Sequence, residues 1–470
     1  MSAEASDMSS WLLMGLPGVV LLTGVAGNTT GFAEALWTAI GLAVGTYLNW
    51  LFVAKRIRKY SARIGANTLP DFFSNRFGDK KGILCVIAAV IIIVFFVPYT
   101  GSGFAAVGKL FNSLFGVDYH TVLIIGAIVI TLYTVIGGFL AASTTDLIQS
   151  IVMTIALFVV IFFGIESVGL DNVFDNVKAI PNYFSITGTD GTSYGLIPII
   201  STMAWGLGYF GMPHILLRFM AIEDDRKLKL SRRIATVWVV ISMAVAILIG
   251  IVGYTFAVNQ GLLAQEGFDA ERIIIYMAKN ISGLDTFAAV IAGLILAGIL
   301  ASTMSTADSQ MLAAASSVSE NLIKRFFWKN IKPRAQMWVA RLTVVVIAIV
   351  GVILAWNPDS SVFRIVSFAW AGFGGTFGAL ILFSLFWKRT NLWGALAGML
   401  SGGIVIFVWK FIIRPLGGAL DIYELLPAFI VSAVAIVVVS LLTKAPDKEV
   451  TDTFDAVNAE IKAERTAKTN

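Results

Sequence analysis

The chain has 470 residues, of which 57% are hydrophobic and only 13% are charged, and its mean hydropathy is +0.84. A soluble domain is nearer one quarter charged, so this composition excludes a water-soluble globular protein and indicates a polytopic membrane protein. The formal charge of +5 does not indicate a nucleic-acid partner, because the basic residues lie in short loops between apolar segments. A single cysteine, Cys85, excludes an intramolecular disulfide and a cysteine-based metal cluster.

The first ten residues are polar and run directly into the apolar stretch Trp11 to Val25. They carry a carboxylate, Asp7, and several hydroxyls at membrane depth, where such groups usually face a partner or a water-filled cavity. A polar segment that leads into half of a spanning helix is typical of the broken helices with which transporters bind ions and small solutes. This opening therefore predicts a transport site.

About 20 apolar residues cross the hydrocarbon core of a bilayer. After the opening half-helix, the hydrophobic pattern predicts eleven further spans, and no soluble domain. They are 33–54, 83–110, 119–142, 146–169, 196–220, 234–258, 286–312, 334–356, 361–387, 392–413 and 421–443.

The basic residues predict the orientation of these spans. Lys and Arg gather in the loop 55–82, around 226–233, around 324–334 and at 388–389, and all four clusters fall on one side if the spans alternate. The positive-inside rule makes this side cytoplasmic, together with the polar tail 444–470. We therefore expect a multi-pass protein of the cell inner (plasma) membrane with a cytoplasmic C-terminus.

A second interrupted helix is predicted in the span 196–220, where three glycines and a proline fall within residues 205–213. Glycine costs about 1 kcal/mol and proline about 3 kcal/mol in a helix interior, and the freed backbone groups are tolerated only where they are buried in protein or line a cavity. The alternative is a simple proline kink with aromatic packing. Both interpretations place Trp205, Tyr209 and Pro213 at the interruption.

The end of span 286–312 carries a polar helix face. Ser302, Ser305 and Ser309 are three and four residues apart, and Thr306 is one turn from Ser302. Hydroxyl and carbonyl oxygens suit a hard alkali cation, although small hydroxyl residues also pack helices together in membranes. Asp308 lies within the same stretch and is either part of a cation site or a solvated carboxylate near the cytoplasmic end.

A further polar stretch, 133–149, contains Tyr133, a glycine pair and Asp146. Asp146 stands at the predicted start of the span 146–169, so helix capping is a sufficient explanation for it. The glycine pair permits two helices to approach closely.

These stretches carry a resemblance to a known family. In family order, residues 5–9, 11–18, 68–71, 133–149, 205–214, 304–306 and 369–374 resemble the sodium/solute symporter family, and within it the sodium/proline symporters. The resemblance implies an all-α polytopic membrane protein with the inverted five-helix repeat of the leucine-transporter-type fold. Residues 1–443 would be the transporter domain, with repeats at 1–169 and 196–387, two extra C-terminal helices at 392–443, and a cytoplasmic tail at 444–470.

The same resemblance implies the site residues. Na+ would lie between the carbonyls of Ala5, Met8 and Ser302 and the hydroxyls of Ser305 and Thr306, with Asp7 in electrostatic support. Substrate would lie between Ser9 and Ser10 on one side and Trp205, Tyr209 and Pro213 on the other, with Tyr133 nearby. In some relatives a second Na+ is held at the positions of Asp146, Ser305, Asp308 and Ser309, so a second ion is an alternative here.

Two features depart from the family pattern. Relatives commonly have glycine at the position of Ser10, so the pocket would be smaller or more polar. Relatives also carry an N-terminal helix and the first half of core helix 1 before the position of Met1. We therefore expect the first repeat to be truncated and the chain as given to transport poorly or not at all.

The function implied is secondary active transport: symport of Na+ with L-proline, or a close analogue, into the cell. Na+ would be a co-transported ion rather than a tightly held cofactor, and the protein is expected to be monomeric. Alternatives are a Na+-coupled symporter of another small organic solute (pantothenate, a monocarboxylate or a sugar) and a truncated fragment without activity. An intramembrane enzyme would need a catalytic partner for His120 or His214, and neither has one in its own segment. A membrane sensor would need a signalling domain, for which the tail is too short.

Overall fold

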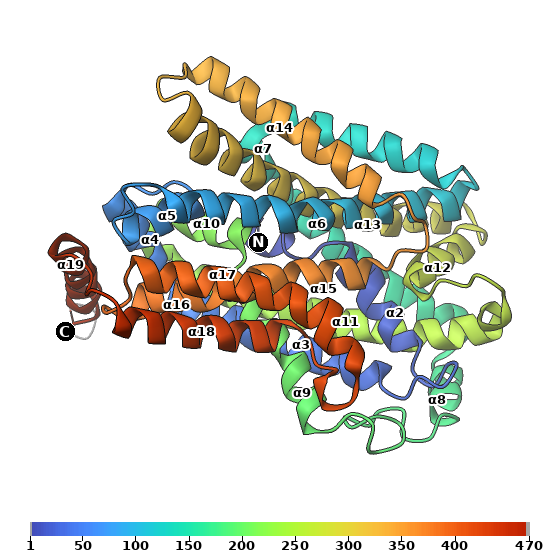
Figure 1. Ribbon diagram of the computed structural model, residues 1–470. Helices are drawn as coiled ribbons and strands as arrows, with labels where there is room; N and C mark the ends of the chain where they lie inside the picture. The colour runs from blue at the N-terminus through green and yellow to red at the C-terminus, as the bar shows by residue number, and fades with distance from the viewer. Residues whose placement is uncertain (1, 467–470) are drawn as a thin grey trace.

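The computed structural model describes residues 2–466. All regular elements in that part of the chain are helices, and it contains no β-strand (Figure 1). Nine of the described helical stretches are long and apolar enough to cross a membrane. These are Gly31–Ile64, Ile83–Phe115, Tyr119–Val168, Asp225–Asn259, Thr286–Phe327, Pro333–Leu354, Val362–Phe386, Leu392–Leu416 and Leu425–Leu442. Shorter apolar helices, Trp11–Leu21 and Leu196–Phe210, are the two that the sequence predicted to be broken.

The first half of the chain builds one broken and several continuous helices. They are α1 (Ser2–Ala5), η1 (Trp11–Gly15), α2 (Leu16–Leu21), α3 (Gly31–Leu48), η2 (Asn49–Val53), α4 (Ala54–Ile64), α5 (Leu69–Arg76), α6 (Ile83–Phe115), α7 (Tyr119–Val168) and α8 (Leu170–Lys178). α3, η2 and α4 run on as one helix of 34 residues, long enough to cross a membrane and to extend beyond it.

Helix α7 is two helices joined at Gly138, whose φ of 63° is outside the helical region. The hydroxyls of Tyr133 and Thr145 contact each other. Twelve residues span about 18 Å of straight helix, so the two halves of α7 must fold back on each other. The two predicted spans are therefore present, but the reversal occurs at Gly138 and not at residues 143–145. Asp146 lies inside the second half and is not a helix cap, which corrects the capping interpretation.

The second half of the chain also begins with a broken helix, and continuous helices follow it. Its elements are α9 (Leu196–Met203), η3 (Ala204–Phe210), α10 (Pro213–Ala221), η4 (Asp225–Lys227), α11 (Leu228–Asn259), η5 (Leu262–Ala264), η6 (Ala270–Arg272), α12 (Ile273–Ser282), α13 (Thr286–Ser316), η7 (Ser317–Phe327), α14 (Pro333–Leu354), α15 (Val362–Phe373), η8 (Gly374–Gly378) and α16 (Ala379–Phe386).

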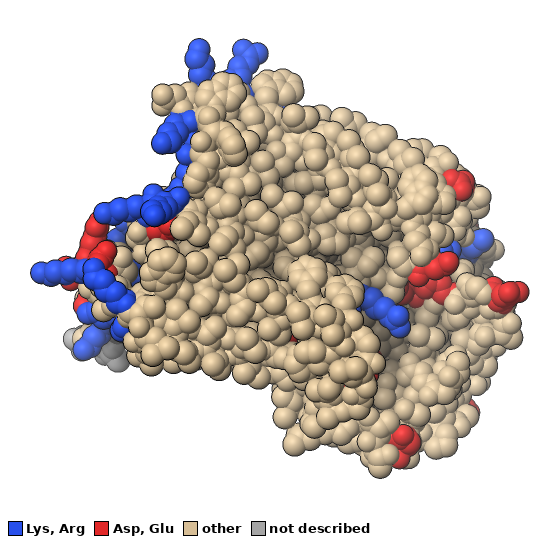
Figure 2. Space-filling model, viewed as in Figure 1, with Lys and Arg blue, Asp and Glu red and all other residues tan. Residues whose placement is uncertain are grey.

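The C-terminal part begins with a helical hairpin of α17 (Leu392–Val408) and α18 (Leu425–Leu442), which pack along each other. Short turns η9 (Trp409–Ile413), η10 (Arg414–Leu416) and η11 (Gly418–Leu420) join them. The polar tail is helical, as α19 (Lys448–Thr466), and lies across one end of the bundle (Figure 1). Lys and Arg gather at the end where α19 lies, whereas a broad uncharged surface separates it from the other end (Figure 2). This is the distribution of a protein that spans a membrane.

Candidate functional site

The first helix break lies between α1 and η1. The N–H groups of Asp7 and Met8 both donate to the carbonyl of Glu4, at 3.1 and 2.9 Å, and the N–H of Ser9 donates to the carbonyl of Asp7. The carbonyl of Ala5 is thereby released from the usual bond to the residue four positions ahead. Every residue from Glu4 to Ser10 is buried, so the released groups face protein and not lipid.

The second break lies between η3 and α10, as the glycine and proline pattern predicted. Residues 204–210 form a 3₁₀ helix, and Met212 is extended before Pro213 starts α10. Proline is favoured at that first position because its missing N–H would have no helical partner there. The carbonyls of Trp205 and Tyr209 accept hydrogen bonds from Trp370 Nε1, at 2.7 Å, and from Asn49 Nδ2, at 2.9 Å.

Glycine at position 206 is required by packing. A Cβ on Gly206 would come within 2.2 Å of the carbonyl oxygen of Gly41 on α3, and a Cβ on Gly45 would come within 2.3 Å of the carbonyl of Gly206. The backbone of the second break therefore lies directly against that of α3. The helix interruption and close packing against α3 thus occur at the same place.

The two breaks meet in the interior. The hydroxyl of Tyr209 donates to Asp7 Oδ2 at 2.6 Å, and the rings of Trp11 and Trp205 stack with centroids 5.9 Å apart. Asp7 Oδ1 is buried without a hydrogen-bond partner among the described residues. The carboxylate of Asp7, two residues along the chain from Ala5, thus has one satisfied oxygen and one without a partner in the described part of the chain.

Helix α13 reaches the first break through its predicted hydroxyl face. Ser305 Oγ lies 2.8 Å from the carbonyl oxygen of Ala5 and 3.2 Å from that of Ser302. Thr306 Oγ1 is buried and has no partner among the described residues. Four of the five oxygen donors predicted for Na+ therefore lie on this face of α13 or contact it. They are the hydroxyls of Ser305 and Thr306 and the carbonyls of Ala5 and Ser302. The fifth comes from Met8, which is fully buried in the same break.

This donor set fits an alkali cation. Hydroxyl and carbonyl oxygens are hard ligands, and a buried hydroxyl without a partner is rare in a folded protein. A cation between these groups would give Thr306 Oγ1 the partner that it lacks. Asp7 would supply negative charge two residues from Ala5.

The aromatic residues predicted for substrate lie beside the breaks. Trp205 packs against Tyr423 and Phe363 with ring centroids 5.2 and 5.4 Å apart, and Tyr209 meets Trp370 edge to face at 5.0 Å. On the opposite side Ser9 and Ser10 are buried, and Ser10 Oγ has no partner in the described part of the chain. The buried hydroxyl of Tyr99 on α6, near Asp7 and Ser9, is likewise without a partner among those residues. Tyr99 is a polar group at this position that sequence reasoning missed.

Tyr133 lies apart from this aromatic set. Its hydroxyl contacts Thr145, one residue before Asp146, on the facing half of α7. It therefore belongs to a second polar cluster, built around Asp146, Asp308 and Ser309.

The second cluster contains an arginine that sequence reasoning also missed. Arg218 of α10 donates through Nη2 to Asp146 Oδ2 at 2.5 Å and to Ser309 Oγ at 2.8 Å. Its Nε donates to Ser2 Oγ at 3.0 Å, which itself donates to Asp146. Ser309 Oγ also bonds Asp308 Oδ1, whereas Asp308 Oδ2 has no partner among the described residues. The residues predicted for a second Na+ thus surround a guanidinium of the protein itself.

Both Arg218 and a second missed residue, Glu4, had a signal in the sequence. Each is an ionisable residue inside a predicted membrane segment, where such residues are rare and usually functional or paired. Glu4 is fully buried, and its Oε1 accepts from Trp50 Nε1 at 2.7 Å and from Thr46 Oγ1 at 3.3 Å. The first break therefore carries two buried carboxylates and not one.

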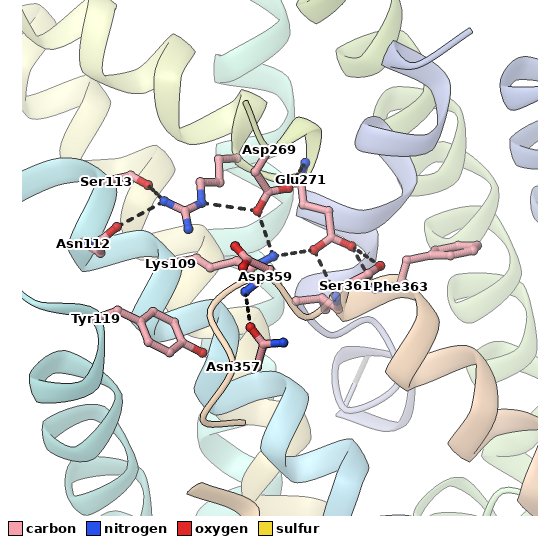
Figure 3. Close-up of polar contacts among 12 residues, drawn as sticks. Lys109, Asn112, Ser113, Tyr119, Asp269, Glu271, Asn357, Asp359, Ser361 and Phe363 are labelled. Carbon is pink, nitrogen blue, oxygen red and sulfur yellow. Dashed lines mark hydrogen bonds and ion pairs between the residues drawn. The ribbon is translucent and has the colours of Figure 1, made fainter. Parts of the chain in front are cut away.

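An ion-pair network lies at the end of the molecule opposite α19 (Figure 3). Lys109 Nζ, at the end of α6, lies 2.8 Å from Asp269 Oδ2 and 3.0 Å from Glu271 Oε2. The Glu271 carboxylate also accepts from the N–H groups of Val362 and Phe363 at 3.0 Å, which caps the start of α15.

The first broken helix packs directly under this network. A Cβ on Gly15 would lie 3.1 Å from Phe363, and one on Gly18 would lie 3.1 Å from the backbone of Ala270. The helical part after the first break is thus held against α15 and η6.

Comparison with known proteins identifies the family and the fold of the chain. The sequence model of the sodium:solute symporter family matches residues 1–402. The chain is 41% identical over 460 residues to the high-affinity proline transporter PutP of Bacillus subtilis (strain 168), covering 97% of this chain and 92% of that one. It is also 41% identical over 464 residues to the sodium/proline symporter of Escherichia coli (strain K12), covering 98% and 88%.

Solved structures agree on the fold. The substrate-bound outward-open state of a Na+-coupled sialic acid symporter has a TM-score of 0.74 at 18% identity, covering 95% of this chain and 90% of that one. MhsT in complex with L-phenylalanine has a TM-score of 0.56 at 14% identity, covering 94% and 96%. At these identities the likeness establishes the leucine-transporter-type fold.

Proposed function

Because the chain belongs to the sodium:solute symporter family, we propose that it moves L-proline, or a close analogue, into the cell together with Na+. The relatives named as proline transporters are 41% identical over almost the whole chain, which supports this substrate. The observation that carries the proposal is the bond between Ser305 Oγ and the carbonyl of Ala5, beside the unpartnered hydroxyl of Thr306. It joins α13 to the first break at a cluster of hard oxygens. The chain is a transporter and not an enzyme.

In the proposed mechanism Na+ binds between the carbonyls of Ala5, Met8 and Ser302 and the hydroxyls of Ser305 and Thr306. A ligand shifts a conformational equilibrium only through different affinities for the two states. Na+ would supply this difference, because its ligands come from two elements, the first break and α13, that must lie together to bind it. Asp7 adds negative charge at the site and, through the Tyr209 hydroxyl, links the Na+ position to the second break.

The amino acid would lie between the two breaks. Its carboxylate would accept from N–H groups freed near Ser9 and Ser10, and its ring would pack on Trp205 and Tyr209, beside Pro213. Support comes from Ser10 Oγ, a buried polar atom without a partner among the described residues. Tyr133 is not part of this proposed set, because its hydroxyl contacts Thr145 in the second cluster.

We further propose a stoichiometry of one Na+ per solute. The residues of the alternative second site, Asp146, Asp308 and Ser309, have the guanidinium of Arg218 among them, with Nη2 at 2.5 Å from Asp146. A fixed cation there would compete with a second Na+. The dependence of uptake on Na+ concentration should therefore have a Hill coefficient near 1, and a coefficient near 2 would contradict this stoichiometry.

The remaining expectations are part of the same proposal. The residues would form two inverted repeats, 1–169 and 196–387, in a monomer of the cell inner (plasma) membrane. The basic end with α19 would be cytoplasmic and the end with Lys109 and Glu271 extracellular, following the positive-inside rule.

The test is counterflow of radiolabelled L-proline in proteoliposomes that contain the purified chain with and without a restored upstream helix. Accumulation by the version with that helix should require Na+ and should be lost when K+ replaces it. Excess pantothenate, lactate or glucose should not compete, whereas competition by one of these would identify another solute of the same fold. Na+-independent binding and exchange of proline would overturn the proposal.

A further inference from the structure

A polar cavity of about 450 Å³ lies where α4, α5 and α19 meet, at the basic end of the molecule and away from the transport site. Four cationic side chains line it: Arg63, Arg76, Lys80 and Arg325. Arg76 is the unusual one, since only 1% of its surface is exposed.

The guanidinium of Arg76 is only partly satisfied. Its Nε donates to the carbonyl of Ser384 at 2.8 Å, on α16. Nη1 and Nη2 have no hydrogen-bond partner in the described part of the chain. The rings of Tyr60, Phe77 and Phe454 lie 5.0–5.3 Å from the guanidinium carbon. Aromatic faces stabilise the positive charge but offer no acceptor in the plane of the two terminal nitrogens.

A second donor shares this situation. Tyr60 is another residue of the cavity wall, and its hydroxyl is buried and has no partner among the residues described. Buried donors are almost always paired in proteins, with protein, water or a ligand. An acceptor with several oxygens could pair all three of these donor atoms, which have no partner among the described residues.

The charges that line the cavity favour an anionic ligand. Two acidic residues also line it, but Asp79 uses its two oxygens on the N–H groups of Gly82 and Leu84, at 2.9 and 2.7 Å. Glu449 is exposed at the start of α19. The first turn of α19 forms part of the wall, and the N-terminal end of a helix favours anions.

We propose that this cavity binds a phosphate group, held by Arg76 Nη1 and Nη2 and by the Tyr60 hydroxyl, with Arg63, Lys80 and Arg325 around it. Planar guanidinium groups bind phosphate through two parallel hydrogen bonds. The group is either inorganic phosphate or the headgroup of an acidic phospholipid. Since α4, α5 and α19 all contribute to the wall, the bound anion fastens the C-terminal helix to the end of the bundle.

The test uses the full chain, purified and reconstituted in nanodiscs of phosphatidylcholine without proline. Inorganic phosphate is added at constant ionic strength, with chloride as the balancing anion, and the melting temperature is followed. Phosphate should raise it by several degrees, whereas chloride should not. Arg76→Gln should weaken the apparent affinity for phosphate at least tenfold.

Two further variants keep the test decisive if Arg76→Gln does not fold. Arg63→Gln removes a half-exposed charge at the cavity rim and should weaken phosphate affinity about threefold. Arg226→Gln removes an exposed charge of the same end, outside the cavity, and should leave the affinity unchanged. Equal responses of all variants and the unaltered chain, or no response of the unaltered chain, would overturn the proposal.

The lipid source is distinguished in a second arm. The chain is placed in nanodiscs that contain phosphatidylglycerol, and the lipids retained after extraction are counted by native mass spectrometry. If a headgroup is the natural ligand, the unaltered chain retains more phosphatidylglycerol than Arg76→Gln and no longer responds to phosphate. If the phosphate response persists and lipid retention is equal, the ligand is a soluble phosphate.

Discussion

Two polar positions about one turn apart on α13 differ in the groups that the protein places around them. At Ser305 and Thr306 the protein supplies neutral oxygens and the nearby carboxylate of Asp7, with no cationic side chain among their described contacts. At Asp308 and Ser309 it supplies a guanidinium, since Arg218 lies between Ser309 and Asp146. A buried ionised carboxylate is stabilised by a nearby positive charge. The difference teaches that one position presents only oxygens to an exchangeable ion, whereas the other already contains a cation that is tethered to the protein.

The strongest way to break this comparison is to remove the tethered charge. Arg218→Gln leaves Asp146 buried without its ion pair, which should lower the free energy of unfolding by about 3–5 kcal/mol. Thermal unfolding in the absence of Na+ measures this. Arg218→Lys, which keeps the charge, should lose much less.

The same variant tests the assignment of the second position. With the guanidinium gone, Na+ should stabilise Arg218→Gln more steeply, with a Hill coefficient above 1. A variant as stable as the unaltered chain, with an unchanged Na+ response, would mean that the two positions do not differ as proposed.

The next effect concerns the exchangeable position. Ser305→Ala or Thr306→Ala removes one oxygen donor and should raise the half-saturating Na+ concentration about tenfold, or about 1.4 kcal/mol. Na+-dependent proline uptake in proteoliposomes measures it. Ser317→Ala is a matched control, because among the described residues Ser317 Oγ bonds the carbonyl of Ala313, one turn earlier in the chain. An equal shift in the control would argue against a specific site.

A smaller effect is expected from the solute side. Trp205→Ala removes stacking with Trp11 and should weaken proline binding about fivefold, within the range of about 0.5–1.5 kcal/mol for aromatic pairs. Its half-saturating Na+ concentration should change by less than twofold at saturating proline. Equal effects of Trp205→Ala and Ser305→Ala on both ligands would show that ion and solute do not have separate sites.

The smallest effect sharpens the role of Asp7. Tyr209→Phe removes the hydroxyl that donates to Asp7 at 2.6 Å, a bond that favours the ionised form of that buried carboxylate. The half-saturating Na+ concentration should rise about twofold, measured by Na+-dependent quenching of tryptophan fluorescence. A fall in that concentration would mean that the hydroxyl competes with Na+ for the carboxylate instead.

Much of this arrangement could be predicted from the sequence, for local reasons. Three glycines and a proline at 205–213 weaken a helix wherever they occur, and hydroxyls three and four residues apart share a face in any helix. The spans follow from hydropathy in the same way. The contact between Ser305 and Ala5 joins residues 300 positions apart, and only the resemblance to a known family suggested it.

What could not be predicted depends on distant partners. The sequence pattern places the reversal in α7 after residue 142 and so predicts a helix cap at Asp146, whereas Gly138, with a φ of 63°, reverses the chain earlier. Arg218 meets Asp146 and Ser309 across 72 and 91 residues. The burial of the Arg76 guanidinium likewise depends on a distant partner, because Phe454 of α19 packs against it. Pairing between helices has no periodic signature in a chain.

The positive charge of Arg218 is covalently attached to the protein, and this has an electrical consequence. A side-chain charge stays with the protein when the solute is released, so it adds nothing to the net current of a full cycle. With a zwitterionic solute and one Na+, each molecule taken up moves one elementary charge. A potential of 100 mV adds about 2.3 kcal/mol to that movement, enough for about 50-fold accumulation from voltage alone.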